Sequence, residues 1–501
     1  MSAGSHTRSE GARFLLDGQS VSSGNLPCTM TVLEYLREVA RRTGTKEGCA
    51  EGDCGACTVV LGKLSTDGSR IDYRAINSCI RFLPTIDGHE LVTVESLSSP
   101  DGALHPVQQA LVDEHGAQCG FCTPGFVMSL LALYLRTPQA TRAQVLEALS
   151  GNLCRCTGYR PIIAAGCRMH GYAAPSHWSR AAPGLQARRA ALQALQRRDS
   201  LRLPGFLAPR TIGELAAAFA EDPGALLLAG GTDVGLWVTK ELRELPTILY
   251  IGGVEELHTL RKSAAGLQIG AAVSLSDAWD ALVETYPALA ELAQRFGSPP
   301  VRNSGTLCGN LANGSPIGDA IPVLMALGAE LELRRGAHVR RVPLERFYLG
   351  YQRKDLQAGE FIVSALVPPP REQEWVAAYK LSKRFDQDIS AVCAAFAVRV
   401  AEGRVVSARL AFGGMAPVVA RAARTERALL GADWSEASIV RAGACLAEDF
   451  TPLSDLRGSS AFRLESARNL LRRFYFEHTH EHAHAAVATR TVHALAAMPP
   501  A

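Results

Sequence analysis

The sequence predicts a multidomain α+β protein, and three observations support this fold class. The chain has 501 residues, which is more than one hydrophobic core usually serves, so roughly two to four domains are expected. Strand-like and helix-like segments mix in residues 12–92, helical spacing dominates 93–172, and strands alternate with helices after residue 203. Nine of the 13 cysteines lie between Cys28 and Cys156, and eight of these form two sets of four.

Changes in pattern and composition place the expected boundaries. Residues 173–202 are rich in Arg and Ala and read as a linker with some helical tendency. The last 24 residues, rich in His, read as a disordered, solvated tail rather than a metal site. The expected segments are 12–92, 93–172, the linker 173–202, 203–370, 371–477 and the tail 478–501, whose closely spaced histidines are His478, His480, His482 and His484.

The helical segment 93–172 has recognisable helix boundaries. Four helices are expected there, over 105–116, 123–137, 141–152 and 159–171. Thr123 is the expected N-cap of the second helix, with proline at its first position. The third helix begins with a Thr-x-x-Gln capping box, and a glycine near its end predicts its C-terminal stop.

The overall composition excludes several classes of partner. The chain is 47% hydrophobic and 20% charged, as in globular proteins, and its formal net charge is +3. That charge is too small to predict a nucleic-acid partner or an anionic membrane surface. No run of 18 apolar residues predicts a membrane span, and the N-terminal residues lack the apolar region of a secretory signal. The expected location is therefore the cytoplasm, where cysteines serve more often as ligands or core residues than in disulfides.

The first cysteine set has the spacing C-x4-C-x2-C followed by a distant fourth cysteine; its members are Cys49, Cys54, Cys57 and Cys79. This is the spacing of plant-type 2Fe–2S ferredoxins. A cluster held by four thiolates is negatively charged, so backbone N–H groups must turn toward its sulfurs. Gly48, Gly52 and Gly55 provide the conformational freedom that such a tight loop needs. A zinc site favours two CxxC-like pairs, and this set has only one.

The second cysteine set combines C-x2-C with C-x-C; its members are Cys119, Cys122, Cys154 and Cys156. The first pair precedes one predicted helix, and the second pair follows another. Two antiparallel helices would bring these ends together, so that four sulfurs converge at one end of a small bundle. On spacing alone, zinc remains a competitor of an iron–sulfur cluster, although C-x-C is less usual for a zinc knuckle.

The motifs around both sets resemble those of a known family. EGCAEGDCGACTVV with NSCI, followed by QCGFCTPGF and GNLCRCTGYRPI, is similar to the two iron–sulfur domains of the xanthine oxidase/xanthine dehydrogenase family of molybdenum hydroxylases, in family order and at family separation. The resemblance implies that the second set also holds a 2Fe–2S cluster. It further implies a β-grasp ferredoxin domain and then a four-helix domain, whose cluster lies nearer the molybdenum.

Two glycine-rich segments after the linker are candidates for a flavin site. In ALLLAGGTDVG an apolar strand runs into a turn, and Gly230 and Gly231 could leave N–H groups free for a diphosphate. Taken alone, a plain strand and turn explains this segment equally well. In NSGTLCGNLANGSPIGDAIPV, small residues let the backbone approach a flat or charged ligand, and Asp319 could accept hydrogen bonds from ribose hydroxyls or a ring N–H. No G-x-G-x-x-G opens a βαβ unit, so a Rossmann site has no support.

Both segments resemble the FAD-binding domain of the same family, which is of the vanillyl-alcohol-oxidase type. The family has two adjacent glycines where this chain has Cys308 and Gly309, and we interpret Cys308 as a packing residue rather than a catalytic one. The resemblance also implies a C-terminal flavoprotein subdomain, marked by FGGMAP, and a loop, 384–388, that governs access of NAD⁺; by itself this loop looks like a solvated charged loop. The residues implied to bind FAD are Leu226, Leu227, Leu228, Ala229, Gly230, Gly231, Thr232, Asp233, Phe296, Thr306, Gly309, Asn310, Asp319, Ile362 and Lys380.

The resemblance also implies a function. The chain ends after the flavin part, so it is expected to be the small subunit of a split enzyme, with molybdopterin on a separate large subunit in a heterotetramer or larger assembly. Electrons from hypoxanthine or xanthine hydroxylation would pass through the helical-domain cluster, the ferredoxin-like cluster and FAD to NAD⁺, and no residue of this chain need act on the purine. One alternative keeps the cofactors but gives the partner an aldehyde, an N-heterocycle or carbon monoxide. Another is a non-enzymatic redox sensor or electron-transfer module.

Overall fold

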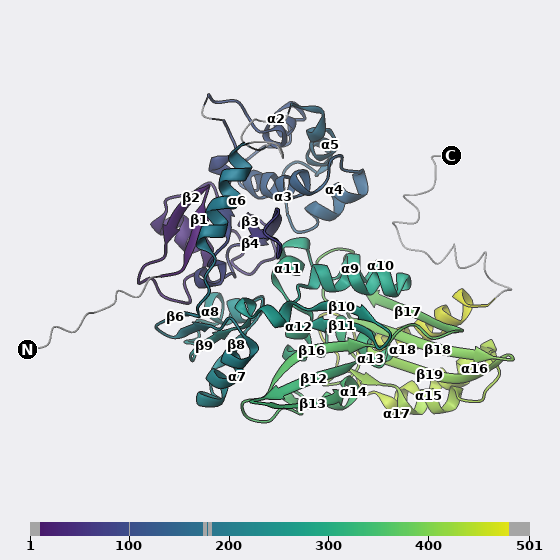
Figure 1. The fold of residues 1–501 in the computed structure, drawn as a ribbon. Helices are drawn as coiled ribbons and strands as arrows, with labels where there is room; N and C mark the ends of the chain where they lie inside the picture. The colour runs from purple at the N-terminus through teal and green to yellow at the C-terminus, as the bar shows by residue number, and fades with distance from the viewer. Residues whose placement is uncertain (1–10, 100, 174–177, 179–182, 480–501) are drawn as a thin grey trace, which may run out of the picture.

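The computed structural model describes residues 11–99, 101–173, 178 and 183–479, and it forms the expected succession of domains. Figure 1 shows a small domain built on β1–β4 beside a helical cap of α2–α5, with a larger flavin-type part below them. No helix in the described ranges is both long and apolar enough to cross a bilayer. Residues 480–501, which include most of the predicted His-rich tail, lie outside the description.

The first domain is a five-stranded sheet in the order β2-β1-β5-β3-β4, the β-grasp arrangement that the sequence motifs implied. Its first hairpin turns through Asp17 and Gly18, whose φ angles of 53° and 83° are those of the two-residue turn that an Asp-Gly pair favours. The sheet packs its apolar face on α1, with Phe14 and Val32 fully buried. The elements are β1 (Arg13–Leu16), β2 (Gln19–Ser22), α1 (Val32–Glu34), β3 (Thr58–Leu64), β4 (Ile71–Asn77) and β5 (Glu90–Val92).

The second domain has the four helices that the sequence predicts. Thr141 caps the third of them, and the capping box with Gln144 is formed as expected. The expected N-cap of the second helix is one residue off: Cys122 takes that position, and Thr123 lies inside the first turn, where its hydroxyl has no hydrogen-bond partner among the described residues. The helices are α2 (Pro106–Asp113), α3 (Thr123–Arg136), α4 (Arg142–Leu149) and α5 (Arg160–Arg168).

The segment expected to be a linker contains a helix, α6 (Pro183–Leu195), that lies against the first domain. Leu192 and Leu195 pack with Leu15 of β1. Arg188 of the same helix forms an ion pair with the buried Glu90 of β5, at 2.8 Å. The few apolar side chains of this Arg- and Ala-rich segment are therefore enough to dock it on the sheet.

The flavin-type part begins with a four-stranded sheet in the order β6-β7-β9-β8 and continues into a five-stranded antiparallel sheet in the order β10-β11-β16-β12-β13. The largest apolar cluster of the described residues packs helices α9, α12 and α13 on this second sheet. The strands are β6 (Leu201–Leu203), β7 (Phe206–Ala208), β8 (Leu226–Leu228), β9 (Ile248–Tyr250), β10 (Leu260–Ser263), β11 (Gly266–Gly270), β12 (Glu330–Arg335), β13 (His338–Pro343), β14 (Tyr348–Gly350), β15 (Arg353–Lys354) and β16 (Phe361–Val367). The helices are α7 (Ile212–Glu221), α8 (Val234–Thr239), α9 (Leu275–Thr285), α10 (Ala290–Arg295), α11 (Pro299–Ser304), α12 (Leu307–Asn313), α13 (Ala320–Ala326) and α14 (Leu344–Phe347).

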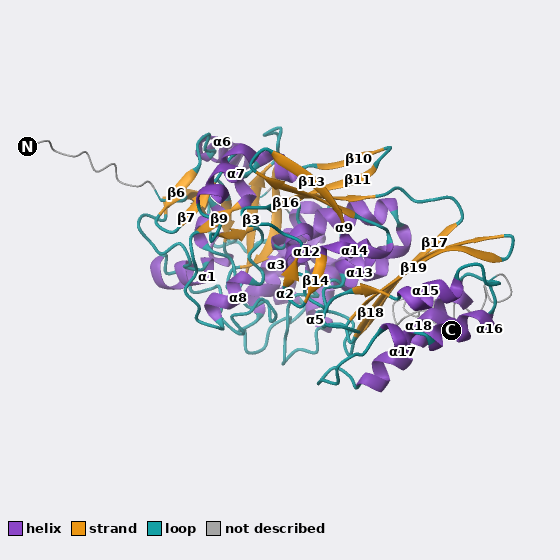
Figure 2. Cartoon of the chain, turned by 90° about the horizontal axis from the view of Figure 1, so that it is seen from below, coloured by secondary structure: helices purple, strands orange, loops and turns teal. Residues whose placement is uncertain are grey.

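The C-terminal subdomain is a four-stranded antiparallel sheet in the order β17-β18-β19-β20. Figure 2 shows helices α15–α18 grouped against this sheet. His478, which the sequence assigned to a solvated tail, instead follows α18 and packs on Phe474 and Trp375, because its ring extends the aromatic cluster there. The elements are β17 (Glu374–Leu381), β18 (Val392–Ala401), β19 (Arg404–Gly413), β20 (Ala420–Arg421), α15 (Ala423–Leu429), α16 (Glu436–Ala444), α17 (Leu446–Asp449) and α18 (Ser460–Glu477).

Candidate functional site

The loop that carries three cysteines of the first set, residues 48–57, is shaped by its glycines. Gly52 and Gly55 have φ angles of 80° and 70°, which side-chain-bearing residues adopt only with strain. A Cβ added at Gly48 would lie 2.7 Å from the Cys54 sulfur, and one at Gly55 would lie 2.1 Å from the Gly151 carbonyl oxygen. The loop therefore wraps tightly around the place where its sulfurs point, as the sequence predicts.

The four sulfurs of the first set form two pairs. The Cys57 and Cys79 sulfurs are 3.3 Å apart. A hydrogen bond from the Cys54 thiol, followed by backbone N–H donors of the loop, lowers the pKa of Cys49 to about 4. The thiol of Cys79 likewise lowers the pKa of Cys57. Two pairs of sulfurs with hydrogen-bond donors around them match a two-iron cluster, in which each iron takes two cysteines.

The second set is brought together from two helix ends, as predicted. Cys119 and Cys122 precede α3, while Cys154 and Cys156 lie between α4 and α5. Burial and a hydrogen bond with Cys154 raise the pKa of Cys122 to about 12, and a hydrogen bond with Cys119 raises the pKa of Cys156. These contacts join each cysteine of one helix end to one cysteine of the other. The pairing again suits a two-iron cluster.

The two sets differ in exposure. Cys57 and Cys79 are 1% and 2% exposed. In the second set, Cys119 and Cys156 are exposed, and Cys154 is buried. Within the described residues, no three His, Cys, Asp or Glu side chains are placed to hold a single metal ion, so the fit of both sets to clusters rests on their pairwise arrangement.

The loops of the two cysteine sets are joined by hydrogen bonds. The Leu153 N–H donates to the Cys54 carbonyl at 3.0 Å. Cys54 belongs to the first set, and Leu153 directly precedes Cys154 of the second set. The side chain of Asn152 donates to the Gly55 carbonyl at 3.0 Å and accepts from the Ser129 hydroxyl at 2.6 Å. Sequence reasoning did not assign a role to Asn152, although this residue lies within the cluster motif GNLCRCTGYRPI.

The first cysteine set also contacts the flavin-type part. A Cβ added at Gly235, in α8, would lie 2.4 Å from the Ile80 carbonyl oxygen, next to Cys79. Leu236 of α8 packs in a small apolar cluster with Cys57, Cys79 and Ile80. The Thr239 hydroxyl donates to the Ala50 carbonyl at 2.9 Å. The turn before α8 is one of the two predicted flavin segments, so the first set lies directly beside it.

The two predicted flavin segments lie against each other, although about 75 residues separate them in the chain. A Cβ at Gly230 would lie 2.0 Å from the Ser304 carbonyl oxygen, and one at Gly309 would lie 2.7 Å from the Thr306 hydroxyl and 3.7 Å from Ala229. Thr306 is the N-cap of α12 and accepts from the Gly309 N–H. A side chain at position 230 would clash with the Ser304 carbonyl, so the close approach of the two segments requires a glycine there.

A buried hydrogen-bond acceptor in this region indicates that a ligand binds here. The Asn310 side-chain carbonyl oxygen is buried and has no hydrogen-bond partner among the described residues, a costly arrangement unless a bound donor satisfies it. FAD carries ribityl and ribose hydroxyls and a ring N–H that could donate there. Together with the glycine cradle, the residues present fit FAD.

The predicted flavin residues are distributed over several elements of the flavin-type part. Leu226–Leu228 form β8, residues 229–233 the turn after it, and Thr306, Gly309 and Asn310 the start of α12. Phe296 ends α10 and packs on Trp279, with ring centroids 5.4 Å apart. Ile362 lies on β16, within the same core cluster as Cys308.

Asp319 and Lys380 form a buried ion pair. The Lys380 ammonium lies 2.6 Å from one oxygen of Asp319, and the Ser390 hydroxyl donates to the other oxygen at 2.6 Å. Both side chains are at most 6% exposed. The sequence predicted each residue as a separate flavin contact; the structure places them together between α13 and β17. The ammonium has further N–H donors that this carboxylate does not occupy.

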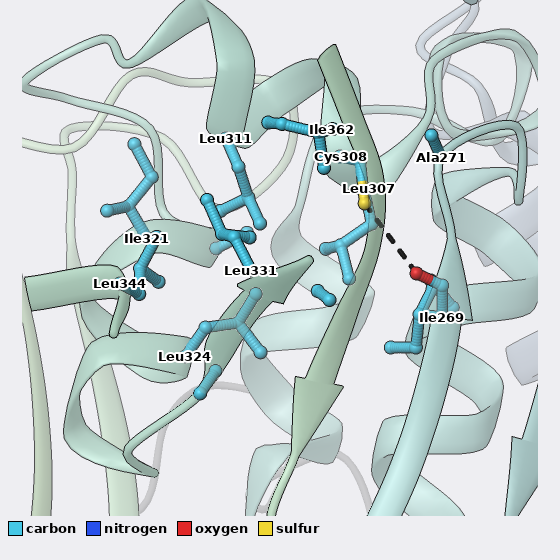
Figure 3. Packing of buried hydrophobic residues seen from close by; sticks show 14 of the residues in the cluster. Ile269, Ala271, Leu307, Cys308, Leu311, Ile321, Leu324, Leu331, Leu344 and Ile362 are labelled. Carbon is cyan, nitrogen blue, oxygen red and sulfur yellow. Dashed lines mark hydrogen bonds between the residues drawn. The ribbon is translucent and has the colours of Figure 1, made fainter. Parts of the chain in front are cut away.

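Cys308 is a core residue, as predicted. Its sulfur donates to the Ile269 carbonyl at 3.7 Å and is surrounded by Leu307, Leu311 and Ile362 (Figure 3). Complete burial raises the pKa of this thiol to about 12, so it stays protonated. A thiol is thus tolerated at this position because its side chain points into the apolar core.

Four protein-family models match the chain in consecutive segments. They are a 2Fe-2S iron-sulfur cluster binding domain at residues 15–82, a 2Fe-2S binding domain at 93–167, the FAD binding domain in molybdopterin dehydrogenase at 199–370, and the CO dehydrogenase flavoprotein C-terminal domain at 377–478. Each falls on one of the structural units described above, in the same order.

Curated relatives match along nearly the whole chain. The xanthine dehydrogenase/oxidase of Gallus gallus is 30% identical over 536 residues, which cover 93% of this chain and 39% of that protein. The xanthine dehydrogenase of Emericella nidulans is 32% identical over 528 residues, which cover 93% and 38%. The chain thus spans less than two fifths of the length of these relatives.

Solved structures match over about half of the chain. A carbon monoxide dehydrogenase chain from Hydrogenophaga pseudoflava is 29% identical with a TM-score of 0.50, covering 54% of this chain and 94% of that chain. A carbon monoxide dehydrogenase chain from Oligotropha carboxidovorans is 25% identical with a TM-score of 0.50, and the match covers 56% of this chain and 96% of that chain. With its two 2Fe–2S domains, its FAD-binding domain and its C-terminal flavoprotein domain in this order, the chain belongs to the molybdenum hydroxylase family and has the layout of its iron–sulfur and flavin subunit.

Proposed function

We propose that this chain is the electron-transfer subunit of a xanthine dehydrogenase. The observation that carries the proposal is the unbroken series of contacts from the second cysteine set to the first, and from the first to the flavin segments. In the proposed assembly, electrons arrive from a molybdopterin subunit that hydroxylates hypoxanthine or xanthine, pass through both 2Fe–2S clusters to FAD, and leave on NAD⁺. FAD supplies the conversion between single electrons and a hydride.

Each part of the chain has a defined task in this proposal. The eight cysteines hold the clusters, and the N–H donors around them stabilise their negative charge. The glycine segments hold FAD, with Asn310 and the Asp319–Lys380 pair as its polar neighbours. No residue of this chain acts on the substrate of the molybdenum centre. Loop 384–388 is proposed to govern access of NAD⁺.

The extent of the matches supports xanthine as the substrate of the partner. The xanthine dehydrogenases match this chain over 93% of its length as single proteins, so they combine the iron–sulfur and flavin domains in this order. The carbon monoxide dehydrogenase chains are almost fully covered by about half of this chain. The fused arrangement is therefore the one found in the xanthine enzymes. The alternative substrates are an aldehyde, an N-heterocycle or carbon monoxide.

The remaining parts of the assembly are also proposals. The relatives are more than twice as long as this chain, and we assign the molybdopterin part to a separate large subunit, in a heterotetramer or larger complex in the cytoplasm. Purifying this chain with that subunit tests the substrate: the intact, molybdenum-loaded complex is expected to reduce NAD⁺ when xanthine is added. A loaded complex without xanthine-dependent activity would refute the substrate and leave the cofactor assignment standing.

A non-enzymatic redox sensor is the second candidate function, because a sensor needs only the iron–sulfur clusters. Iron and flavin quantitation of the purified chain, followed by mixing with NADH, separates the two. The proposal expects about four irons and one FAD per chain, from two Cys₄-ligated 2Fe–2S clusters, and rapid reduction by NADH. A loaded chain that NADH does not reduce would favour the sensor.

A further inference from the structure

The end of helix α4 lies between a cluster loop and the flavin-type part. Residues 150–153 follow α4 directly and lead into the cluster ligand Cys154. A Cβ added at Gly151 would lie 2.9 Å from the Ser298 Cβ and 3.0 Å from Pro300, so this segment is wedged against the segment just after Phe296. We propose that Arg302 is a positioning residue that fixes the Phe296 segment of the flavin site to this end of α4; the inference rests on the proposed electron-transfer function.

The Arg302 side chain binds the Phe296 segment from inside the protein. One of its terminal nitrogens donates to the carbonyl oxygens of Gln294, Phe296 and Gly297, each at 3.2 Å. The side chain is 7% exposed. Gly297 has a φ of 56°, so the chain turns sharply directly after the aromatic ring. Three carbonyls that converge on one guanidinium hold this turn in a single conformation.

The same guanidinium reaches across to the helical domain. Its other terminal nitrogen donates to the Glu147 carboxylate in the last turn of α4 at 2.8 Å. In Figure 1, α4 lies next to α9, α10 and α11, the helices that flank the Phe296 segment. A cleft of about 490 Å³, lined by α3 and α4 on one side and by α9, α10 and α11 on the other, separates the two domains beside this ion pair. The ion pair therefore bridges a gap that close side-chain packing does not fill.

Arg302 is a buried cation with carboxylates nearby. Burial lowers its pKa, and the carboxylates of Glu147, Asp280 and Asp386 oppose this effect. Among the described residues, Glu147 is the carboxylate that hydrogen-bonds to Arg302, so its removal weakens the compensation of this buried charge. The two residues thus act together: the Arg302 guanidinium binds the carbonyls of the flavin-type part, and the Glu147 carboxylate binds the same guanidinium from the helical domain.

This geometry matters for electron transfer because the rate depends on how closely and rigidly the redox groups are held. The cluster loop, the end of α4, Arg302 and the Phe296 turn form one connected series of contacts. Freeing the turn would loosen the contact between the Phe296 segment and the cluster-bearing domain, and electron transfer slows as the distance between redox groups grows.

The test uses the full chain loaded with both clusters and FAD, mixed with NADH in a stopped-flow instrument. NADH gives a hydride to FAD, and its two electrons then reduce one cluster each, with release of a proton. Arg302→Met should slow cluster reduction severalfold and leave the hydride step near the wild-type rate. Arg302→Lys, a point charge without the fork, should recover only part of the loss. Glu147→Gln, which keeps the shape of the acceptor, should show an intermediate defect.

A second measurement does not depend on activity. Amide hydrogen exchange of the full chain should speed up at residues 294–298 in Arg302→Met and in Glu147→Gln, with no change in the ferredoxin-like domain. The matched control is Arg424→Met, which removes an exposed ion pair with Glu448 and should change neither readout. Wild-type rates and wild-type exchange in Glu147→Gln would overturn the inference, even if Arg302→Met failed to fold. A wild-type chain that NADH cannot reduce would instead refute the proposed NAD⁺ function.

Discussion

The two cysteine sets have the same number of ligands but lie in different surroundings. The first set, here called the enclosed set, lies between the β-grasp sheet and α8, with Cys57 and Cys79 at most 2% exposed and Cys49 and Cys54 half-buried. The second set joins two helix ends, and Cys119 and Cys156 are exposed. The enclosed set touches both the second set and a flavin segment, so its surroundings suit an internal relay. The exposed set suits a point where electrons enter from another protein.

Loss of the enclosed set should have the largest effect. In the assembled enzyme, Cys54→Ala should abolish multiple-turnover NAD⁺ reduction, because the proposed relay between the exposed set and the flavin is interrupted. The iron content should fall from about four to about two per chain. Cys167→Ala, which alters an exposed cysteine outside both sets, should change neither value. Sustained NAD⁺ reduction by Cys54→Ala would show that the enclosed set is not on the path.

Loss of the cluster held by the exposed set should stop electron entry from the partner without affecting electron entry from NADH. Cys156→Ser should stop electron delivery from the partner subunit but preserve FAD and the cluster of the first set. NADH should still reduce that remaining cluster at the wild-type rate, as followed by absorbance. If partner-driven NAD⁺ reduction persisted in a variant shown to lack this cluster, electrons would enter elsewhere.

Breaking the buried ion pair of the flavin site should have a smaller, local effect. Lys380→Met leaves the Asp319 carboxylate buried and uncompensated, at a cost of about 3–5 kcal/mol in the free energy of unfolding. FAD content should fall while the iron content stays unchanged. Lys262→Met, on the exposed edge of the same part, is the matched control. Full FAD occupancy and unchanged stability in Lys380→Met would contradict the assigned role.

The smallest effect is expected at the junction between the sets. Asn152→Ala removes the donor to the Gly55 carbonyl and the acceptor of Ser129, at a cost of about 1–3 kcal/mol in unfolding free energy. Both clusters should still form, and electron exchange between them should be slower. Asn469→Ala, on the surface of α18, should be neutral by comparison. Equal stabilities of the two variants in chemical denaturation would show that the junction adds nothing.

Sequence reasoning predicted local features well, because they depend on neighbouring residues. The spacing of the cysteines, the capping box at Thr141 and the positive φ angles of Gly52 and Gly55 are all set within a few residues. The N-cap of α3 was expected at Thr123, one residue late, because Cys122 takes the cap position.

Contacts between distant segments could not be read from the sequence. The docking of α6 on Glu90, the contact of Asn152 with Gly55 and the Arg302–Glu147 pair each join residues at least 97 positions apart. No local pattern distinguishes these side chains from other polar residues. The proximity of the two glycine segments was expected only through the family resemblance, and their backbone contacts required the tertiary structure.

The central claim is the order flavin, enclosed set, exposed set. EPR spectroscopy of the purified, loaded chain after mixing with NADH tests it directly. In the wild type, two distinct reduced 2Fe–2S signals should appear. In Cys54→Ala, FAD should still be reduced by NADH, but the signal of the remaining exposed cluster should fail to develop on the same time scale. Reduction of that cluster at the wild-type rate in Cys54→Ala would contradict the relay.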